Sequence, residues 1–236
     1  TPRSLRPPSV EESGEALAPV SPVPLAWPTV FDAAPTVERA WAALVARRPA
    51  GEQEALDRAL AFARERHADQ SRRGSATPYW VHPVRVAMEL ARWGEDDAAL
   101  LQAALLHDVV EDTATTSGEV RARFGDEVAD LVDWLTAPTS LRPGEVRAYY
   151  ERMQRQAPAP ARMLKLADRT DNLRSIQALV MRTGSRHRLW AAAYLDRTRH
   201  QVLPLAARAP SVARVALVTA MHDLAPLIGS ASFTHP

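Results

Sequence analysis

The sequence reads Leu105-Leu106-His107-Asp108-Val109-Val110-Glu111-Asp112 within one of its most apolar stretches. The apolar residues predict a buried helix over residues 95–110. An ionised carboxylate is costly in such a helix unless it is paired or bound to a metal. His107 and Glu111 are four residues apart, as are Asp108 and Asp112, so the two pairs are expected to form adjacent rows on one helix face. The segment therefore predicts a helical core that carries a metal site.

Apolar residues recur with helical spacing along most of the remaining chain, and no alternating strand pattern of any length appears. Thr36 is the expected N-cap of the first helix. Pro83 directly follows His82 and suits a first helical turn, so His82 is expected at the start of a helix. The predicted fold is all-α, with helices at about 36–47, 52–70, 82–93, 95–110, 116–124, 125–136, 145–156, 159–180, 186–203 and 210–228.

The first 35 residues differ from the rest in composition, because prolines are frequent and periodic apolar residues are few. Proline at this density blocks helices and sheet ladders, so the segment predicts an extended or disordered arm. We therefore expect two parts, an arm over 1–35 and one helical domain over 36–230.

Composition excludes several classes of protein. The 236 residues carry a net charge of +1 and no cysteine. A nearly neutral chain with scattered basic residues gives no field for nucleic acid or membranes, and no apolar run approaches ~18 residues. A chain without thiolates can bind metal strongly only through His, Asp and Glu. No signal peptide is indicated either. We expect a cytoplasmic enzyme or binding protein, and the composition is compatible with a homo-oligomer.

A second polar constellation falls in the helix expected over 159–180. Asp168, Asn172 and Ser175 follow one another at i, i+4 and i+7 and share a helix face. A bare His-Asp pair carries little information, and the chain contains a control for it. His222-Asp223 repeats the dipeptide without an acidic pair one turn later, and we expect it to be exposed to solvent near a helix end.

Five motifs occur together in one order. They are His67-Ala68-Asp69-Gln70 with Arg72-Arg73, Pro78-Tyr79-Trp80-Val81-His82-Pro83, Ala104 to Thr113, Phe124-Gly125-Asp126-Glu127-Val128, and Leu164-Lys165-Leu166-Ala167-Asp168-Arg169 with Asn172. On these motifs, over about residues 55–210, the chain resembles the metal-dependent HD phosphohydrolases. Within them it is similar to the hydrolase domain of the RelA/SpoT alarmone enzymes and its small stand-alone homologues. The fold that this implies is the HD-domain helical bundle.

The resemblance also implies a site and a reaction. One Mn²⁺ would be held by His82, His107, Asp108 and Asp168, a donor set that suits this ion. Glu111 and Asp112 would position or deprotonate the attacking water. The nucleotide would be bound by Arg73, Tyr79, Lys165, Arg169 and Asn172. The implied reaction removes pyrophosphate from the ribose 3′ position of ppGpp or pppGpp and yields GDP or GTP.

The chain departs from the family pattern around the nucleotide. Asp69 replaces a glycine, Gly74 is displaced within the loop before Tyr79, and Asp171 replaces the His of a Leu-His-Asn motif. Asp171 would add negative charge beside a polyanion unless its side chain points away. Two alternatives therefore remain. One is a metal-dependent phosphohydrolase acting on another nucleotide, such as NADPH losing its 2′-phosphate or a phosphorylated intermediate of specialised metabolism. The other is a non-catalytic nucleotide-binding HD module.

Overall fold

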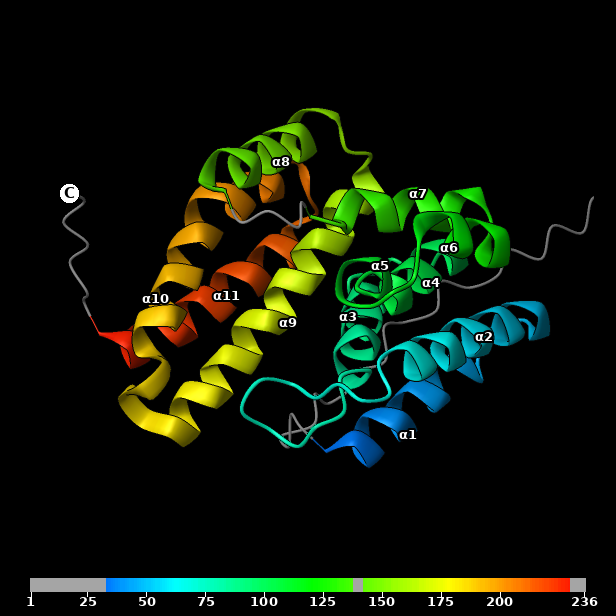
Figure 1. The fold of residues 1–236 in the computed structure, drawn as a ribbon, viewed down its shortest axis with the longest axis horizontal. Coiled ribbons are helices and arrows are strands. Elements are labelled where there is room, and N and C mark those ends of the chain that lie inside the picture. Colours follow the sequence, from blue (N-terminus) through cyan, green and yellow to red (C-terminus); the bar gives the residue numbers. More distant parts are fainter. Residues whose placement is uncertain (1–32, 138–141, 230–236) are drawn as a thin grey trace, which may run out of the picture.

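The computed structural model describes residues 33–137 and 142–229, and these residues are predominantly helical (Figure 1). Within these ranges there is no strand, and one isolated bridge joins Ser71 to Pro78. The all-α prediction is confirmed. Residues 1–32 of the expected arm lie outside the described residues. Ala34 and Pro35, which were expected to end the arm, belong to the first helix, because that helix begins at Ala34.

The helices agree with the expected ranges over most of the chain. They are α1 Ala34–Val45, α2 Ala50–Arg66, α3 Val81–Arg92, α4 Ala98–Leu106, α5 Val109–Asp112, α6 Ser117–Phe124, α7 Asp126–Leu135, α8 Pro143–Gln156, α9 Ala159–Thr183, α10 Arg188–Arg197 and α11 Ser211–Ile228. The segment expected as one helix over 186–203 is divided. A 3₁₀ turn, Gly184–His187, precedes α10, and a π-helical turn, Thr198–Val202, and a 3₁₀ segment, Leu203–Arg208, follow it.

Helix α9 is the centre of the molecule (Figure 1). It packs against α3, α4 and α7 on one side and against α10 and α11 on the other. Leu164, Leu166 and Ala167 are fully buried along it, and even its polar residues Asp168 and Asp171 are withdrawn from solvent. A helix buried on all sides can hold polar groups only where each has a partner. Asp168 and Asp171 are accordingly paired with residues of α3 and of the segment that follows α4.

Two predicted helix starts are corrected by the structure. Helix α1 begins at Ala34 with Ala33 as its N-cap, and Thr36 lies within the first turn. Proline at the second helical position has the φ angle that a helix needs, which favours the earlier start. Helix α4 begins after Asp97 rather than at residue 95, because the Asp97 side chain accepts a hydrogen bond from the Leu100 N–H at 2.8 Å.

Helix α11 meets the length and composition of a membrane span, with a mean hydropathy of 1.3 over 18 residues. The core helix of a soluble protein meets the same test. In this fold Leu217 and Leu224 on α11 are fully buried in the hydrophobic core, and α11 packs along α9. Its apolar character is accounted for in part by this packing.

Candidate metal centre

The helix that carries the His-Asp pair is interrupted at that pair. Helix α4 ends at Leu106, and α5 begins at Val109. The Nδ1–H of His107 donates to the carbonyl oxygen of Ala104 at 2.9 Å. A continuous helix would offer that carbonyl to the N–H of Asp108. The prediction of one helix over 95–110 is therefore wrong at its end, since a side chain competes for a backbone acceptor.

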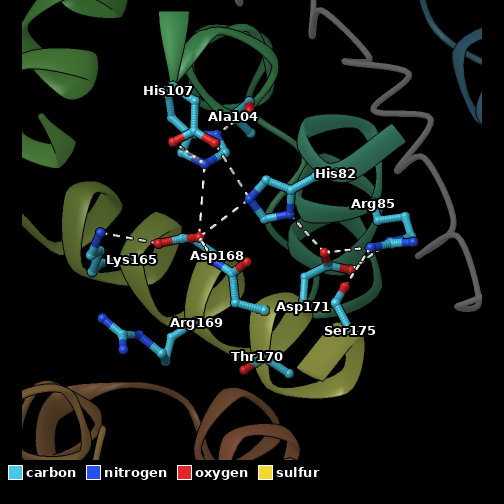
Figure 2. Close-up of polar contacts among 12 residues, drawn as sticks. His82, Arg85, Ala104, His107, Lys165, Asp168, Arg169, Thr170, Asp171 and Ser175 are labelled. Carbon is cyan, nitrogen blue, oxygen red and sulfur yellow. Dashed lines mark hydrogen bonds and ion pairs between the residues drawn. The ribbon is translucent and has the colours of Figure 1, made fainter. Parts of the chain in front are cut away.

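Four of the predicted residues converge on one point, although they come from three separate parts of the chain. His82 stands in the first turn of α3, His107 at the break after α4, and Asp168 in the middle of α9 (Figure 2). Asp108 follows His107 and directly precedes α5. His82 Nε2 lies 3.4 Å from Asp168 Oδ1 and 3.6 Å from Asp108 Oδ2. His107 Nε2 lies 3.1 Å from Asp108 Oδ1 and 3.8 Å from Asp168 Oδ1.

The donor atoms fit a divalent cation. In both imidazoles Nδ1 is engaged elsewhere, His107 with Ala104 and His82 with Asp171, so each Nε2 faces the carboxylates and is left to bind a proton or a metal ion. His107 Nε2 is buried and has no hydrogen-bond partner within the described part of the chain. Donor atoms of His82, His107 and Asp168 all lie within 4.8 Å of one another. A buried nitrogen without a hydrogen bond, 3.1 Å from one carboxylate oxygen and 3.8 Å from another, is an arrangement that a bound cation satisfies.

The electrostatics of the cluster point the same way. Burial alone lowers the pKa of His107, but the charges of Asp108 and Asp168 outweigh it and raise that pKa to about 9. Burial raises the pKa of Asp168, but the ammonium group of Lys165 and the two imidazoles hold it well below its ordinary value. The carboxylates are therefore ionised and attract positive charge, which a proton or a metal ion can supply.

Tyr79 joins the cluster of candidate metal ligands (His82, His107, Asp108 and Asp168) to the acidic residues of α5. Its hydroxyl oxygen lies 2.7 Å from Asp108 Oδ2 and 2.7 Å from Asp112 Oδ2. Burial and the charges of these carboxylates raise the pKa of Tyr79, so the hydroxyl keeps its proton as a donor. The ring of Tyr79 stacks on the buried His67 at 4.6 Å between centroids. Tyr79 is thus held by packing while its hydroxyl faces the cluster.

Glu111 lies apart from this network. Its Oε2 accepts a hydrogen bond from the Ala137 N–H at 3.0 Å, and the residue is exposed. Desolvation of the carboxyl group raises the pKa of Glu111, although Lys165 and the Ala137 N–H act in the opposite direction. Of the two predicted proton-handling groups, Asp112 is therefore linked to Asp108 through Tyr79, and Glu111 is linked to the segment after α7.

Two of the predicted nucleotide contacts bind Asp168 directly. Lys165 Nζ lies 3.0 Å from Asp168 Oδ2, and Asn172 donates through Nδ2 to Asp168 Oδ1 at 2.5 Å. Lys165 is only 8% exposed, so most of this ammonium group is withdrawn from bulk water. Lys165 and Asn172 therefore fix the orientation of the Asp168 carboxylate, in addition to any contact that they make with a ligand.

A cavity of about 510 Å³ adjoins the cluster on the side of Tyr79. Arginine and aromatic side chains dominate its polar lining, namely Arg72, Arg73, Arg182, Tyr79, Trp190 and Tyr194. Arg73 lies over the Trp190 ring at 4.8 Å, and Arg72 donates to Asn172 Oδ1 at 2.7 Å. Guanidinium groups bind phosphates and stack on flat rings, so the lining suits a phosphorylated, planar ligand.

Arg169 contacts two tyrosines and not Asp168, unlike Lys165 and Asn172. The buried guanidinium donates to the Tyr150 hydroxyl at 2.5 Å and lies over the Tyr194 ring at 4.3 Å. Tyr194 also lines the cavity, so Arg169 borders it from behind this ring. Arg169 has a weaker link to the Thr198 hydroxyl, at 3.4 Å, where the π-helical turn begins.

Several residues of the site were missed by sequence reasoning. Arg72, Trp190 and Tyr194 line the cavity, and Arg85 and Asp171 lie behind His82. A signal existed for the last two, because Arg85 follows His82 by three residues and Asp171 follows Asp168 by three, which is the spacing of helix neighbours.

The control pair behaves as expected in one respect: His222 and Asp223 are exposed. They lie within α11, however, and not at its end.

Known proteins share this arrangement of helices and motifs. A family model of the HD domain matches residues 59–194. The chain is 39% identical over 126 residues, 52% of its length and 18% of the relative's, to a guanosine-3′,5′-bis(diphosphate) 3′-pyrophosphohydrolase of Aquifex aeolicus. It is 40% identical over 139 residues, 56% of its length and 77% of the relative's, to the human guanosine-3′,5′-bis(diphosphate) 3′-pyrophosphohydrolase MESH1.

A solved structure agrees with these relatives. It is that of a metazoan orthologue of SpoT that hydrolyses ppGpp and plays a role in starvation responses, with a TM-score of 0.57 and 27% identity over 74% of this chain and 96% of that one. The chain spans only about a fifth of the length of several bacterial relatives that it matches. It belongs to the HD domain family.

Proposed function

We propose that this chain is a Mn²⁺-dependent hydrolase that removes the 3′-pyrophosphate of ppGpp or pppGpp to give GDP or GTP. One observation supports this most. Two imidazole nitrogens and two carboxylates converge where His107 Nε2 is buried and makes no hydrogen bond, beside a cavity lined by arginines and aromatic rings. The relatives named for the same reaction add to it. A soluble nucleotide substrate fits a cytoplasmic location.

In this proposal His82, His107, Asp108 and Asp168 hold one divalent ion. When bound, the ion supplies Lewis acidity that activates water and offsets phosphate charge. Lys165 and Asn172 keep Asp168 in place through their contacts with its two oxygens. These residues come from α3, the α4–α5 break and α9, so the packing of these helices determines the site geometry.

The proposed reaction divides the remaining residues between proton transfer and substrate binding. Water attacks the phosphorus bonded to the ribose 3′ oxygen, a new oxygen–phosphorus bond forms, and the bond to that 3′ oxygen breaks. Glu111 and Asp112 take the proton from water and return one to the departing 3′ oxygen. Arg73, Tyr79 and Asn172, which line the cavity, bind the base, ribose and phosphates. Lys165 and Arg169 lie outside this lining and complete the substrate site by balancing the charge of the phosphates.

The test is a substrate panel with purified protein. ppGpp, pppGpp and NADPH are incubated with Mn²⁺, and nucleotide and phosphate products are separated by chromatography. We expect GDP and pyrophosphate from ppGpp, with activity lost on chelation and in Asp108→Ala. Asp223→Ala is the matched control, because it alters the same dipeptide at an exposed position of α11. Release of phosphate from NADPH alone would favour the other nucleotide, and tight nucleotide binding without turnover would favour a non-catalytic module.

A further inference from the structure

Arg85 and Asp171 form a buried ion pair behind the metal cluster (Figure 2). The Nε–H of Arg85, on α3, donates to Asp171 Oδ1 at 2.7 Å, and its terminal NH₂ donates to Asp171 Oδ2 at 2.9 Å. The two residues are 2% and 1% exposed. A charge at this depth is costly unless geometry and hydrogen bonding compensate it. Here a two-point contact does so, and Ser175 Oγ accepts a further bond from Arg85 at 2.8 Å.

The same carboxylate also binds His82. Asp171 Oδ2 lies 2.7 Å from His82 Nδ1, on the side of the ring opposite Asp108 and Asp168. An ionised carboxylate can only accept, so the proton of the neutral imidazole is on Nδ1, and the Nε2 lone pair faces the cluster. The charge of Asp171, which would oppose a polyanionic ligand in the cavity, therefore points away from it.

We propose that Asp171 is a positioning residue that fixes the tautomer and orientation of His82 toward the divalent ion, and that Arg85 is its charge partner. This inference rests on the metal centre of the proposed function. The position of Asp171 departs from the family pattern, and a carboxylate buried here needs a cation beside it, which Arg85 supplies. Neither residue contacts the ion; both act through His82.

The experiment measures Mn²⁺ affinity by isothermal titration calorimetry. Asp171→Asn keeps the shape of the side chain but removes the carboxylate charge that the buried Arg85 binds, so the double variant Arg85→Met/Asp171→Asn is made as well. In the double variant we expect Mn²⁺ to bind about 10- to 100-fold more weakly, as is usual when a carboxylate behind a ligating histidine is lost. An affinity within twofold of the wild type would overturn the inference.

Glu89→Gln is the matched control. Glu89, buried on α3, pairs with the partly buried Arg174 on α9, with 2.9 Å between Oε2 and Nη1, and neither residue is among the proposed metal ligands. We expect this variant to lose stability and to keep wild-type Mn²⁺ affinity. An equal loss of affinity in the control would overturn the inference, because packing between the helices would then explain both results.

A second measurement does not depend on any variant. Nitrogen-15 NMR of the wild-type protein loaded with diamagnetic Zn²⁺ should show His82 protonated on Nδ1; a proton on Nε2 would overturn the inference. The outcomes separate the two proposals. Metal binding without hydrolysis of any nucleotide would contradict the proposed function and leave the role of Asp171 standing. Normal hydrolysis with unchanged affinity in the double variant would do the reverse.

Discussion

Tyr79 has one hydroxyl hydrogen and two carboxylate neighbours. Asp108 and Asp112 each place an oxygen 2.7 Å from the Tyr79 oxygen. One hydrogen cannot satisfy two ionised groups at full strength, so one of the contacts remains repulsive unless positive charge is nearby. A cation held by Asp108 would remove that conflict. The hydroxyl would then be available to Asp112, the group proposed to handle protons.

Tyr79→Phe tests this arrangement. The ring should stay stacked on His67, so we expect the free energy of unfolding to change by about 1 kcal/mol or less. The kcat for ppGpp should fall about 10-fold or more, because Asp112 loses the donor that orients it. Steady-state kinetics and thermal melts measure the two effects. Tyr149→Phe, which removes a hydroxyl bonded to backbone carbonyls, should keep kcat; an unchanged kcat in Tyr79→Phe would contradict the role.

At the scale of the element, the loop between α2 and α3 decides the shape of the cavity. Ser71 and Pro78 pair across it, and Gly74 sits at its tip with a φ of +67°. An added Cβ at Gly74 would lie 2.6 Å from Leu179 Cδ1 on α9. Glycine is favoured here by its left-handed backbone, and an alanine would also require the end of the Leu179 side chain to move.

Gly74→Ala should strain the backbone of the loop and displace the Leu179 side chain, which lines the cavity. We expect the KM for ppGpp to rise several-fold with a smaller change in kcat, because the proposed metal ligands lie outside this loop. The free energy of unfolding should fall by about 1–2 kcal/mol, because alanine is strained at the positive φ of this position. Kinetics and denaturant unfolding are the measurements. Gly51→Ala serves as the control, since it lies within α2 with open space around it and should be neutral or stabilising by up to about 1 kcal/mol. A kcat effect larger than the KM effect would argue against this view of the loop.

Elements and ligands differ in how far sequence could predict them. Most helices followed from apolar spacing, because that pattern is local and reflects which face is buried. The break at His107 could not be predicted, since it depends on a ring nitrogen competing for the Ala104 carbonyl. The pairing of Asp171 with Arg85 was also missed. It depends on how α3 packs against α9, and the residues are 86 positions apart.

At the scale of the whole molecule, the proposed ion would link parts of the chain that are distant in sequence. His82, His107 and Asp168 come from different helices or their ends, and no short segment contains them all. An unfolded chain therefore has no comparable site, and metal binding should stabilise the folded state alone.

Added Mn²⁺ should raise the melting temperature in a concentration-dependent way. At a free concentration 100 times the Kd, the expected stabilisation is about 2.7 kcal/mol. Differential scanning calorimetry before and after EDTA dialysis measures it. Asp108→Ala should show little or no shift with Mn²⁺. A shift equal to that of the unaltered protein would mean that the stabilising ion binds elsewhere.

Helix α9 sets a fixed distance between the proposed metal site and the far side of the cavity. Asp168 lies at the metal cluster, and Leu179, eleven residues further along the same unbroken helix, lines the cavity. At 1.5 Å per residue the two positions are separated by about 16 Å, and a buried helix does not shorten to suit a smaller ligand. A ligand that places a phosphate at the proposed metal site and also reaches Leu179 must therefore be about 16 Å long. The cavity would then select ligands by length, because a short phosphate ester could contact the proposed metal site or Leu179 but not both.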